Sequence, residues 1–309
     1  MQESSQVIQI DHESLQVNEP ATPPHQAVEQ DQSKPNRRII ALMNQKGGVG
    51  KTTTAVNVGA ALALKGHKCL LIDLDPQAHL SLSLGIDPEV LDASMYQLLA
   101  DSDTSAEQIV QYIDEARNLA VLPAEVNLAG VEAELADRVV TGTAQTTLRS
   151  KCQNLVDQFD YTIIDCPPSL GLLTINALTL AREVIVPMQA HFLALQGLSK
   201  LLETVQMVRR AINPQLIVSG VMLCMYEGQT ILANEVTADL KNFFDQSRDT
   251  DVPWNQATVL QPPIRRNIKL AESPSFGKSI FHYAPDSHGA LDYHKLAQAI
   301  VSHHVAAMT

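Results

Sequence analysis

The sequence predicts an α/β protein in which a doubly wound, mostly parallel sheet is covered by helices on both faces. Short apolar runs rich in Val, Ile and Leu alternate along the chain with longer segments whose apolar residues recur at helical spacing. Continuous apolar runs are typical of strands buried on both faces, as the strands of a parallel sheet are. Some of these runs end at a glycine-rich loop or at acidic residues. Such polar groups would gather at the carboxyl edge of the sheet, where ligands of these folds bind.

Residues 1–36 differ in composition from the rest of the chain. They contain no aromatic residue, four prolines, and six acidic residues against one lysine. A segment of this kind cannot bury enough apolar surface to offset the entropy of ordering it. It also lacks the two amphipathic helices that a helix-turn-helix DNA reader needs. We therefore expect a disordered acidic tail over residues 1–36 and one folded domain over residues 37–309.

A glycine-rich loop over residues 44–54 follows the apolar run 39–43 and precedes a helical run over residues 55–65. A strand, a glycine-rich turn and a helix, in that order, form the setting of a phosphate-binding loop. Glycines let backbone N–H groups approach an anion closely, and the helix adds its unpaired N–H groups and the positive end of its dipole. The predicted phosphate-binding residues are Gly47, Gly48, Val49, Gly50, Lys51, Thr52 and Thr53.

Two side chains of this loop are expected to act on a bound nucleotide. Lys51 would reach the β- and γ-phosphates, and the Thr52 hydroxyl would ligate Mg²⁺. The loop departs from the strict P-loop pattern at one position, where Gln45 replaces a glycine. A second lysine, Lys46, lies inside the loop and is absent from the strict pattern.

Two further strands are predicted to end in acidic residues at the same edge of the sheet. The run 68–75 ends with Asp73 and Asp75, and the run Tyr161–Asp165 ends in a single acid. The second acid position has the Walker B form, and Asp165 is expected to hold a water of a mostly hydrated, octahedral Mg²⁺ ion.

The other elements follow from apolar spacing alone. Between residues 79 and 158 the chain is predicted to be mostly helical, with one strand at 119–123 and helical spacing over 126–140 and 148–159. The second half of the chain is predicted to contain, in order, the strand Glu183–Met188, the helix Ala194–Ala211, a strand over 216–225, a helix over 232–244 and a last helix over 290–305.

Basic residues gather in the segment 263–278, in which Glu272 is the only acid. A local cluster of this kind is the most plausible phosphate-backbone patch of the chain. A solvated charged loop is the alternative interpretation. The predicted DNA-contacting residues are Arg265, Arg266, Lys269 and Lys278.

The overall composition limits the possible functions. The chain has 309 residues, of which 45% are hydrophobic, and a formal net charge of −12, so any contact with DNA must come from a local patch. The four cysteines lack a Cys-x-x-Cys pair, which argues against a zinc or iron–sulfur site. Cys166 follows Asp165 without an implied base partner, and we interpret it as a packing residue. With no run of eighteen apolar residues, a cytoplasmic protein is expected.

The loop sequence Lys-Gly-Gly-Val-Gly-Lys-Thr, residues 46–52, resembles the deviant Walker A box of the ParA/MinD family of ATPases. The resemblance implies that Lys46 reaches across a nucleotide-sandwiched homodimer to the phosphates of the other subunit. Residues 73–77, Asp-Leu-Asp-Pro-Gln, are similar to the family's second motif. That similarity implies that Asp75 orients the attacking water and that Asp73 supports the Mg²⁺ shell through a water or through Thr52. The implied cofactors are ATP and Mg²⁺.

The segment 263–278 is similar to a stretch of Soj-type chromosomal ParA proteins that helps to form the adenine pocket and a DNA-contacting surface. The similarity implies that Asn267 lies near the adenine. Arg265 stands where relatives often have proline. One DNA-binding arginine of those relatives aligns with Lys269, which keeps the charge, and a second aligns with Gln229, which does not.

These resemblances together imply an ATPase that acts in chromosome or plasmid partition. ATP would close a homodimer, the dimer would bind DNA without sequence preference, and a ParB-like partner would stimulate hydrolysis. The expected location is the nucleoid, and no membrane partner is implied. Two alternatives stay open: an ATPase of this family that positions a non-DNA cargo, and a nucleotide-gated scaffold with negligible turnover.

Overall fold

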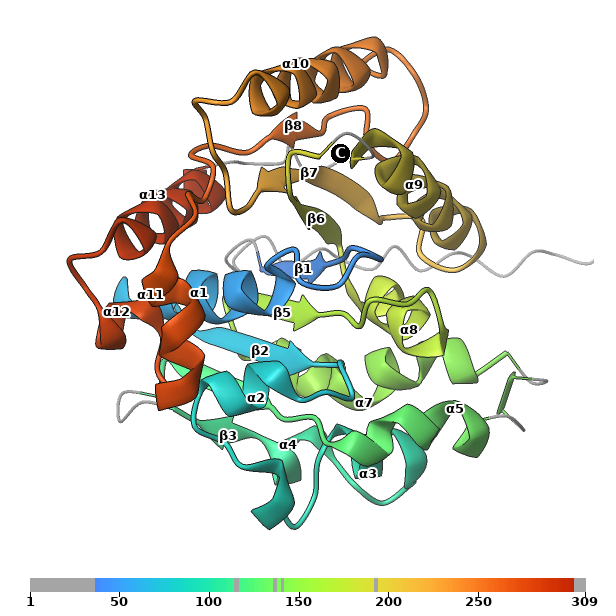
Figure 1. Cartoon of the computed structure of the whole chain (residues 1–309). Helices are drawn as coiled ribbons and strands as arrows, with labels where there is room; N and C mark the ends of the chain where they lie inside the picture. The colour runs from blue at the N-terminus through green and yellow to red at the C-terminus, as the bar shows by residue number, and fades with distance from the viewer. Residues whose placement is uncertain (1–36, 114–116, 136–137, 140–141, 192–193, 303–309) are drawn as a thin grey trace, which may run out of the picture. The chain divides into compact units, whose positions relative to one another are not determined.

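One sheet of eight strands lies at the centre of the described part of the chain, in the order β3-β4-β2-β5-β1-β6-β7-β8 (Figure 1). The computed structural model describes residues 37–113, 117–135, 138–139, 142–191 and 194–302. Within these residues, every neighbouring pair of strands is parallel except β3 and β4, which confirms the predicted sheet type. The strands are β1 Arg38–Leu42, β2 Cys69–Asp73, β3 Gln111–Tyr112, β4 Leu119–Leu122, β5 Tyr161–Asp165, β6 Glu183–Met188, β7 Ile217–Leu223 and β8 Thr258–Val259.

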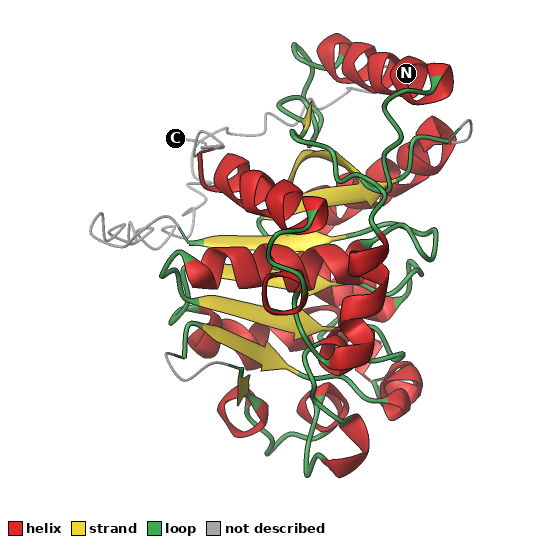
Figure 2. Ribbon diagram, turned by 60° about the vertical axis from the view of Figure 1, so that its left-hand side comes forward, coloured by secondary structure: helices red, strands yellow, loops and turns green. Residues whose placement is uncertain are grey.

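Helices cover both faces of the sheet, as a view turned by 60° shows (Figure 2). The predicted doubly wound α/β fold is therefore confirmed, while the predicted tail over residues 1–36 lies outside the described residues. No helix in the described part of the chain is long and apolar enough to cross a membrane. The helices are α1 Lys51–Leu64, α2 His79–Ser83, α3 Met95–Ala100, α4 Ala106–Ile109, α5 Val131–Glu134, α7 Thr147–Val156, α8 Leu172–Leu180, α9 Ala194–Ala211, α10 Ile231–Gln246, α11 Ile268–Glu272, α12 Ile280–Tyr283 and α13 His288–Ser302.

Two hydrophobic cores fill the spaces between the sheet and its helices. Successive side chains of β1 alternate between them, because neighbouring residues of a strand point to opposite faces. Ile39 and Ala41 join the core beneath α7, α8, α9 and α10. Ile40 and Leu42 join the core beneath α1 and α13. The central strands are therefore buried on both faces, which explains why their sequences are continuous apolar runs instead of alternating ones.

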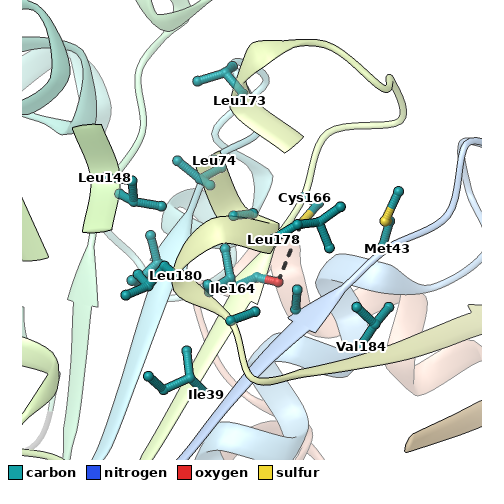
Figure 3. Packing of buried hydrophobic residues seen from close by; sticks show 14 of the residues in the cluster. Ile39, Met43, Leu74, Leu148, Ile164, Cys166, Leu173, Leu178, Leu180 and Val184 are labelled. Carbon is teal, nitrogen blue, oxygen red and sulfur yellow. Dashed lines mark hydrogen bonds between the residues drawn. The ribbon is translucent and has the colours of Figure 1, made fainter. Parts of the chain in front are cut away.

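Cys166 lies in the first of these cores, one residue beyond β5 (Figure 3). Its side chain is fully buried among neighbours that include Met43, Leu178 and Val184, and its Sγ lies 4.0 Å from the carbonyl oxygen of Ile164. Burial raises the pKa of the Cys166 thiol far above its ordinary value. The structure thus gives this cysteine a packing position.

Helix α1 begins at Lys51, four residues earlier than the predicted helical run. The backbone N–H of Thr54 donates to the Gly50 carbonyl at 3.0 Å, so the first turn closes on the last glycine of the loop. The side chains of this first turn are polar, and apolar spacing therefore gave no sign of it. Lys51 and the three threonines that follow it therefore lie on the helix itself, and the helix fixes the directions of their side chains.

The prediction for residues 79–158 was wrong in two respects. A second strand, β3, pairs antiparallel with β4, and residues 126–130 form a 3₁₀ turn in place of the start of a long helix. Strand β8, which pairs with β7, was not predicted either. Both unpredicted strands contain two residues, which is too short for any apolar pattern to reveal.

Replacing Gly220 of β7 with alanine is expected to lower the free energy of unfolding by about 1–3 kcal/mol, the usual cost of overpacking a core. A Cβ at this position would lie 2.4 Å from the carbonyl oxygen of Thr258 on β8, and a strand backbone cannot swing aside as a side chain can. Urea unfolding followed by circular dichroism measures the change. Gly130→Ala is the matched control, because a Cβ there meets no atom within 4 Å. Equal unfolding midpoints for the two variants would contradict this close packing.

Candidate nucleotide-binding site

The glycine-rich loop joins β1 to α1 at the carboxyl edge of the sheet, as predicted. Gly48 and Gly50 have φ angles of +69° and +96°, a conformation that other residues rarely adopt. A Cβ built at Gly47 or Gly48 would meet no atom within 4 Å, so the loop backbone borders open space. N–H groups beside such a space, at the N-terminus of a 14-residue helix, have the setting that suits a bound anion.

The two lysines of the loop lie in different surroundings. Lys51 is only 6% exposed, and its positive charge lowers the pKa of Asp165, which places the two groups near each other. Lys46 is exposed, and its backbone N–H donates to the Asn44 side chain at 3.0 Å. One lysine therefore points into the subunit and the other lies on its surface.

Asp165 has the position and the chemistry of a magnesium ligand. Its Oδ2 accepts a hydrogen bond of 2.6 Å from the Thr52 hydroxyl, which brings both predicted metal-site groups together. Its Oδ1 is buried and has no partner among the described residues, and the same is true of the Gln45 amide nitrogen. An orphaned carboxylate oxygen beside a threonine hydroxyl suits Mg²⁺, which takes oxygen ligands and fills its other positions with water and phosphate.

Asp73 and Asp165 lie side by side at the ends of β2 and β5, in direct register. Burial raises the pKa of Asp165 well above its usual range, and the neighbouring Asp73 raises it further. Burial likewise raises the pKa of Asp73. Two buried carboxylates in contact range repel each other, and a bound cation would relieve that repulsion.

Asp73 is held by the polypeptide that follows β2. Its oxygens accept hydrogen bonds from the Ser81 backbone N–H at 3.0 Å, the Ser81 hydroxyl at 2.8 Å and the Asp75 N–H at 3.2 Å. The Thr52 hydroxyl donates to Asp165 and not to Asp73. Support of the Mg²⁺ shell by Asp73, through a water or through Thr52, stays a prediction. Ser81 was missed because nothing in its surrounding sequence indicates a partner.

Asp75 lies just beyond β2 and is half-buried. Its Oδ1 accepts a hydrogen bond of 3.0 Å from the Gln77 N–H, which fixes the turn after the strand. A carboxylate that is held by its backbone and still reached by solvent can accept a hydrogen bond from a water, as the predicted role requires.

A cavity of about 200 Å³ opens beside the first half of the loop. Its polar lining consists of Asn44, Lys46, Gln189 and His191, and its apolar lining comes from β6, α9 and the loop residue Val49. The Gln189 amide donates to the Gly48 carbonyl at 3.3 Å and contacts His191. Gln189 was missed, although a polar residue that directly follows the strand next to β1 is a signal that could have found it.

The basic segment is more neutral than its sequence indicates. Arg265 forms a two-point ion pair with the buried Asp292, with distances of 2.6 and 2.9 Å. Arg266 pairs with Glu227 at 2.7 Å, and Lys269 pairs with Glu272 at 2.8 Å. Lys278 is exposed and has no ion pair within the described residues.

Glu272 is the only acid within the sequence of this segment, but the fold brings two others from distant parts of the chain, so the expectation of little nearby acid is wrong. Asn267 caps helix α11 by accepting a hydrogen bond of 2.8 Å from the Lys269 N–H. Its predicted contact with an adenine stays a prediction.

Comparison with known proteins agrees with this geometry. The family model for the AAA domain matches residues 37–218. The sporulation initiation inhibitor protein Soj of Bacillus subtilis (strain 168) is 43% identical over 265 residues, which cover 86% of this chain and 98% of that protein. The chain belongs to the Soj/ParA family of P-loop ATPases. The chromosome-partitioning ATPase Soj of Thermus thermophilus is 42% identical, with 86% and 96% covered. The resemblance inferred from the loop is thus confirmed.

Solved structures show the same fold with nucleotide and metal. A Mycobacterium smegmatis protein named cobyrinic acid a,c-diamide synthase, with a bound ATP analogue and magnesium, is 36% identical to this family member, with a TM-score of 0.70 and coverage of 86% of this chain and 95% of that chain. The septum site-determining protein MinD of Pyrococcus horikoshii, in complex with Mg-ADP, is 26% identical, with a TM-score of 0.64 and coverage of 85% and 96%.

Asp165→Asn is expected to raise the unfolding midpoint of the nucleotide-free protein at about pH 8. The pKa of this carboxyl is raised in the folded state and is about 4 in the unfolded state. Above about pH 4 the charged carboxylate therefore opposes folding, and asparagine removes that effect because it carries no charge. The same variant should lose the Mg²⁺-dependent part of its nucleotide affinity. Thermal unfolding and titration calorimetry measure the two effects.

The stabilisation should shrink as the pH falls and vanish below about pH 3, where the wild-type carboxyl is mostly protonated in both states. Asp75→Asn is the matched control, because this carboxyl is half-exposed and should change the midpoint little. A lower midpoint for Asp165→Asn at about pH 8 would contradict the assignment of a costly buried charge.

Proposed function

We propose that this family member is a partition ATPase whose ATP-bound homodimer binds DNA without sequence preference and whose hydrolysis a ParB-like partner stimulates. The observation that carries the proposal is the pair of loop lysines, with Lys51 buried and Lys46 exposed. A subunit needs only one lysine for its own phosphates, and an exposed second lysine is free to reach another subunit. Similarity to Soj and ParA proteins over most of the chain supports the same role.

ATP and Mg²⁺ are the proposed cofactors of a domain over residues 37–309, and residues 1–36 are proposed to be a disordered tail. The protein would act in the cytoplasm, on the nucleoid. N–H groups of the loop residues 47–53 would hold the phosphates, and Asn267 would lie near the adenine. Thr52 and Asp165 would hold Mg²⁺, with Asp73 behind them. When bound, the ion supplies positive charge that offsets the charge of the β- and γ-phosphates.

The chain's own residues would perform the remaining steps of in-line attack by water on the γ-phosphate. Lys51 would neutralise developing charge from within the subunit, and Lys46 of the second copy would add a further positive charge. Asp75 would accept a hydrogen bond from the attacking water and orient it. These roles require a closed dimer, which would couple hydrolysis to dimer release.

The proposed DNA surface lies on the segment 263–278. Arg265 is the least suited to contact a phosphate, because the buried Asp292 already occupies the Nε–Nη2 edge of its guanidinium group. Arg266 and Lys269 belong to exposed ion pairs, which are weak and which a DNA phosphate can replace. Lys278 is free to bind directly. The proposed contacts are therefore Lys278, Lys269 and Arg266, with Arg265 holding the segment in place.

The acids around this segment also favour a second candidate function. Glu227, Glu272 and Asp292 offset most of its positive charge, as a surface for a non-DNA cargo would allow. A family member that positions such a cargo would hydrolyse ATP with no dependence on DNA. A nucleotide-gated scaffold would bind ATP and release almost no phosphate. Phosphate release with and without DNA separates the three functions.

Lys46→Ala and Lys51→Ala are expected to have different effects. Lys51→Ala should weaken ATP binding to the monomer, because it removes a buried cation from the phosphate site. Lys46→Ala should leave that affinity nearly unchanged and abolish dimer formation and turnover. Titration calorimetry, size-exclusion chromatography with ATP and a phosphate-release assay measure the three properties. Equal losses of ATP affinity in both variants would exclude the proposed division of roles.

Lys269→Ala and Lys278→Ala should each weaken DNA binding in the presence of ATP and reduce the slope of log K against log salt by roughly one unit. Gln229→Arg should add a contact and do the reverse. Fluorescence anisotropy with a random-sequence duplex over a range of salt concentrations measures the slope. Lys65→Ala, at the exposed end of α1 away from the loop, is the matched control. Unchanged slopes in all variants would favour the non-DNA cargo.

A further inference from the structure

Helix α13 packs along α1 and brings a buried tyrosine to the phosphate-binding loop (Figure 1). Tyr293 is 1% exposed, and its hydroxyl lies 3.1 Å from the Thr54 hydroxyl in the first turn of α1. Burial raises the pKa of Tyr293, so its phenol keeps a proton to donate. Nothing in the proposed chemistry of the loop uses this residue, which lies 239 positions away from Thr54 in the sequence.

The direction of this hydrogen bond follows from counting protons. A hydroxyl has one proton to donate and two lone pairs to accept with. Thr54 Oγ1 donates its proton to the Gly50 carbonyl at 2.6 Å. Tyr293 must then donate to Thr54, and the three groups form one chain from the phenol through the threonine to the carbonyl. Each bond in such a chain polarises and strengthens the next.

The Gly50 carbonyl belongs to the same planar peptide unit as the Lys51 N–H. In a trans peptide these two groups point in opposite directions. The carbonyl points into α1, toward Thr54, and the N–H therefore points out of the helix, toward the space where the phosphates would lie. Fixing the carbonyl fixes the orientation of that N–H. Gly50 has no side chain to restrain this peptide and has a φ angle of +96°, so the restraint must come from its hydrogen bonds.

The ion pair between Arg265 and Asp292, the residue before Tyr293, ties this part of α13 to the segment 263–278. Asp292, the preceding residue of α13, accepts both side-chain hydrogen bonds of Arg265 and the Arg265 backbone N–H at 3.2 Å. Gly289, one turn earlier, lets α13 approach α11 so closely that a Cβ there would lie 2.8 Å from Leu270 Cγ. Adjacent residues of one helix thus contact the phosphate loop and the segment 263–278.

We propose that Tyr293 is a positioning residue for nucleotide binding, which orients the Lys51 N–H toward the phosphates through Thr54 and Gly50. Nucleotides with a β-phosphate should depend on it, because loop N–H groups cradle that phosphate. Removing one neutral buried hydrogen bond should weaken ADP and ATP binding roughly three- to tenfold. The chemical step should change little, because no group that contacts the attacking water has moved.

Tyr293→Phe tests this proposal, because it removes only the hydroxyl. Titration calorimetry with ADP should show a Kd raised roughly fivefold, and steady-state kinetics should show a similar rise in KM for ATP with kcat within about twofold. Tyr161→Phe is the matched control, since it removes a phenol hydroxyl from another buried tyrosine, at the opposite end of β5 from Asp165. An unchanged Kd for Tyr293→Phe, or an equal rise in both variants, would overturn the proposal.

Variants of Thr54 distinguish positioning from loss of packing. Thr54→Ser keeps the hydroxyl and should bind ADP nearly as the wild type does, whereas Thr54→Val should bind it as weakly as Tyr293→Phe or more weakly. Adding Tyr293→Phe to Thr54→Val should cause no further loss, because the chain is already broken. Additive losses would overturn the proposal. ADP affinity is measured without DNA or partner, so failure of the proposed partition function would leave this test intact.

Discussion

Parallel pairing of β1 and β2 with the strand between them, β5, is the constraint on which the rest of the structure depends. Parallel strands end at the same edge, so the loop after β1 and the acids at the ends of β2 and β5 must meet. Register then decides which groups touch. Asp73 is paired with Asp165, and Leu42 with Asp165 on the other side, so the loop begins beside the carboxylate that receives the Thr52 hydroxyl. A shift of one residue in β5 would turn Asp165 toward the other face and remove the site.

The same pairing makes the site costly to the fold. Two carboxylates are buried at paired positions of neighbouring strands, and both have a pKa raised by burial. One of them is compensated by protein groups, since Ser81 and the Asp75 backbone donate to Asp73. The other, Asp165, retains an oxygen without a partner among the residues that the structure describes. This asymmetry separates a carboxylate that organises the polypeptide from one that is suited to a cation. An unpaired buried oxygen of this kind lowers stability, and its cost is the reason why we propose that it holds a ligand.

Charge in the C-terminal part is arranged by contacts that cross long stretches of sequence. Arg265 and Asp292 are 27 residues apart, and Arg266 and Glu227 are 39 residues apart. The first pair is partly buried and has two-point geometry, which makes it a fixed part of the structure. The second is exposed on both sides and is therefore weak and exchangeable. The basic residues of the segment 263–278 thus fall into two groups. Arg265 is a structural anchor, because its ion pair is fixed, and Arg266, Lys269 and Lys278 are cations that stay available for binding. Through Asp292, the anchor also fixes the helix that carries Tyr293 to the phosphate loop.

The sequence by itself determined the fold class, most of the long elements, the phosphate-binding loop and the family. These features are local: apolar spacing records which faces of an element are buried, and the order of glycines, lysines and threonines in the loop is set by backbone conformations within a few residues.

Only the tertiary structure decided that α1 begins at Lys51, that Thr52 bonds Asp165 instead of Asp73, and that Ser81, Gln189 and Tyr293 contact the site. It also revealed β3 and β8, which are too short to leave a pattern. The physical reason is the same in each case. Hydrogen bonds and ion pairs between distant residues depend on register and on helix packing, and neither the register of two strands nor the rotation of a helix is recorded in the local sequence of the groups that they bring together.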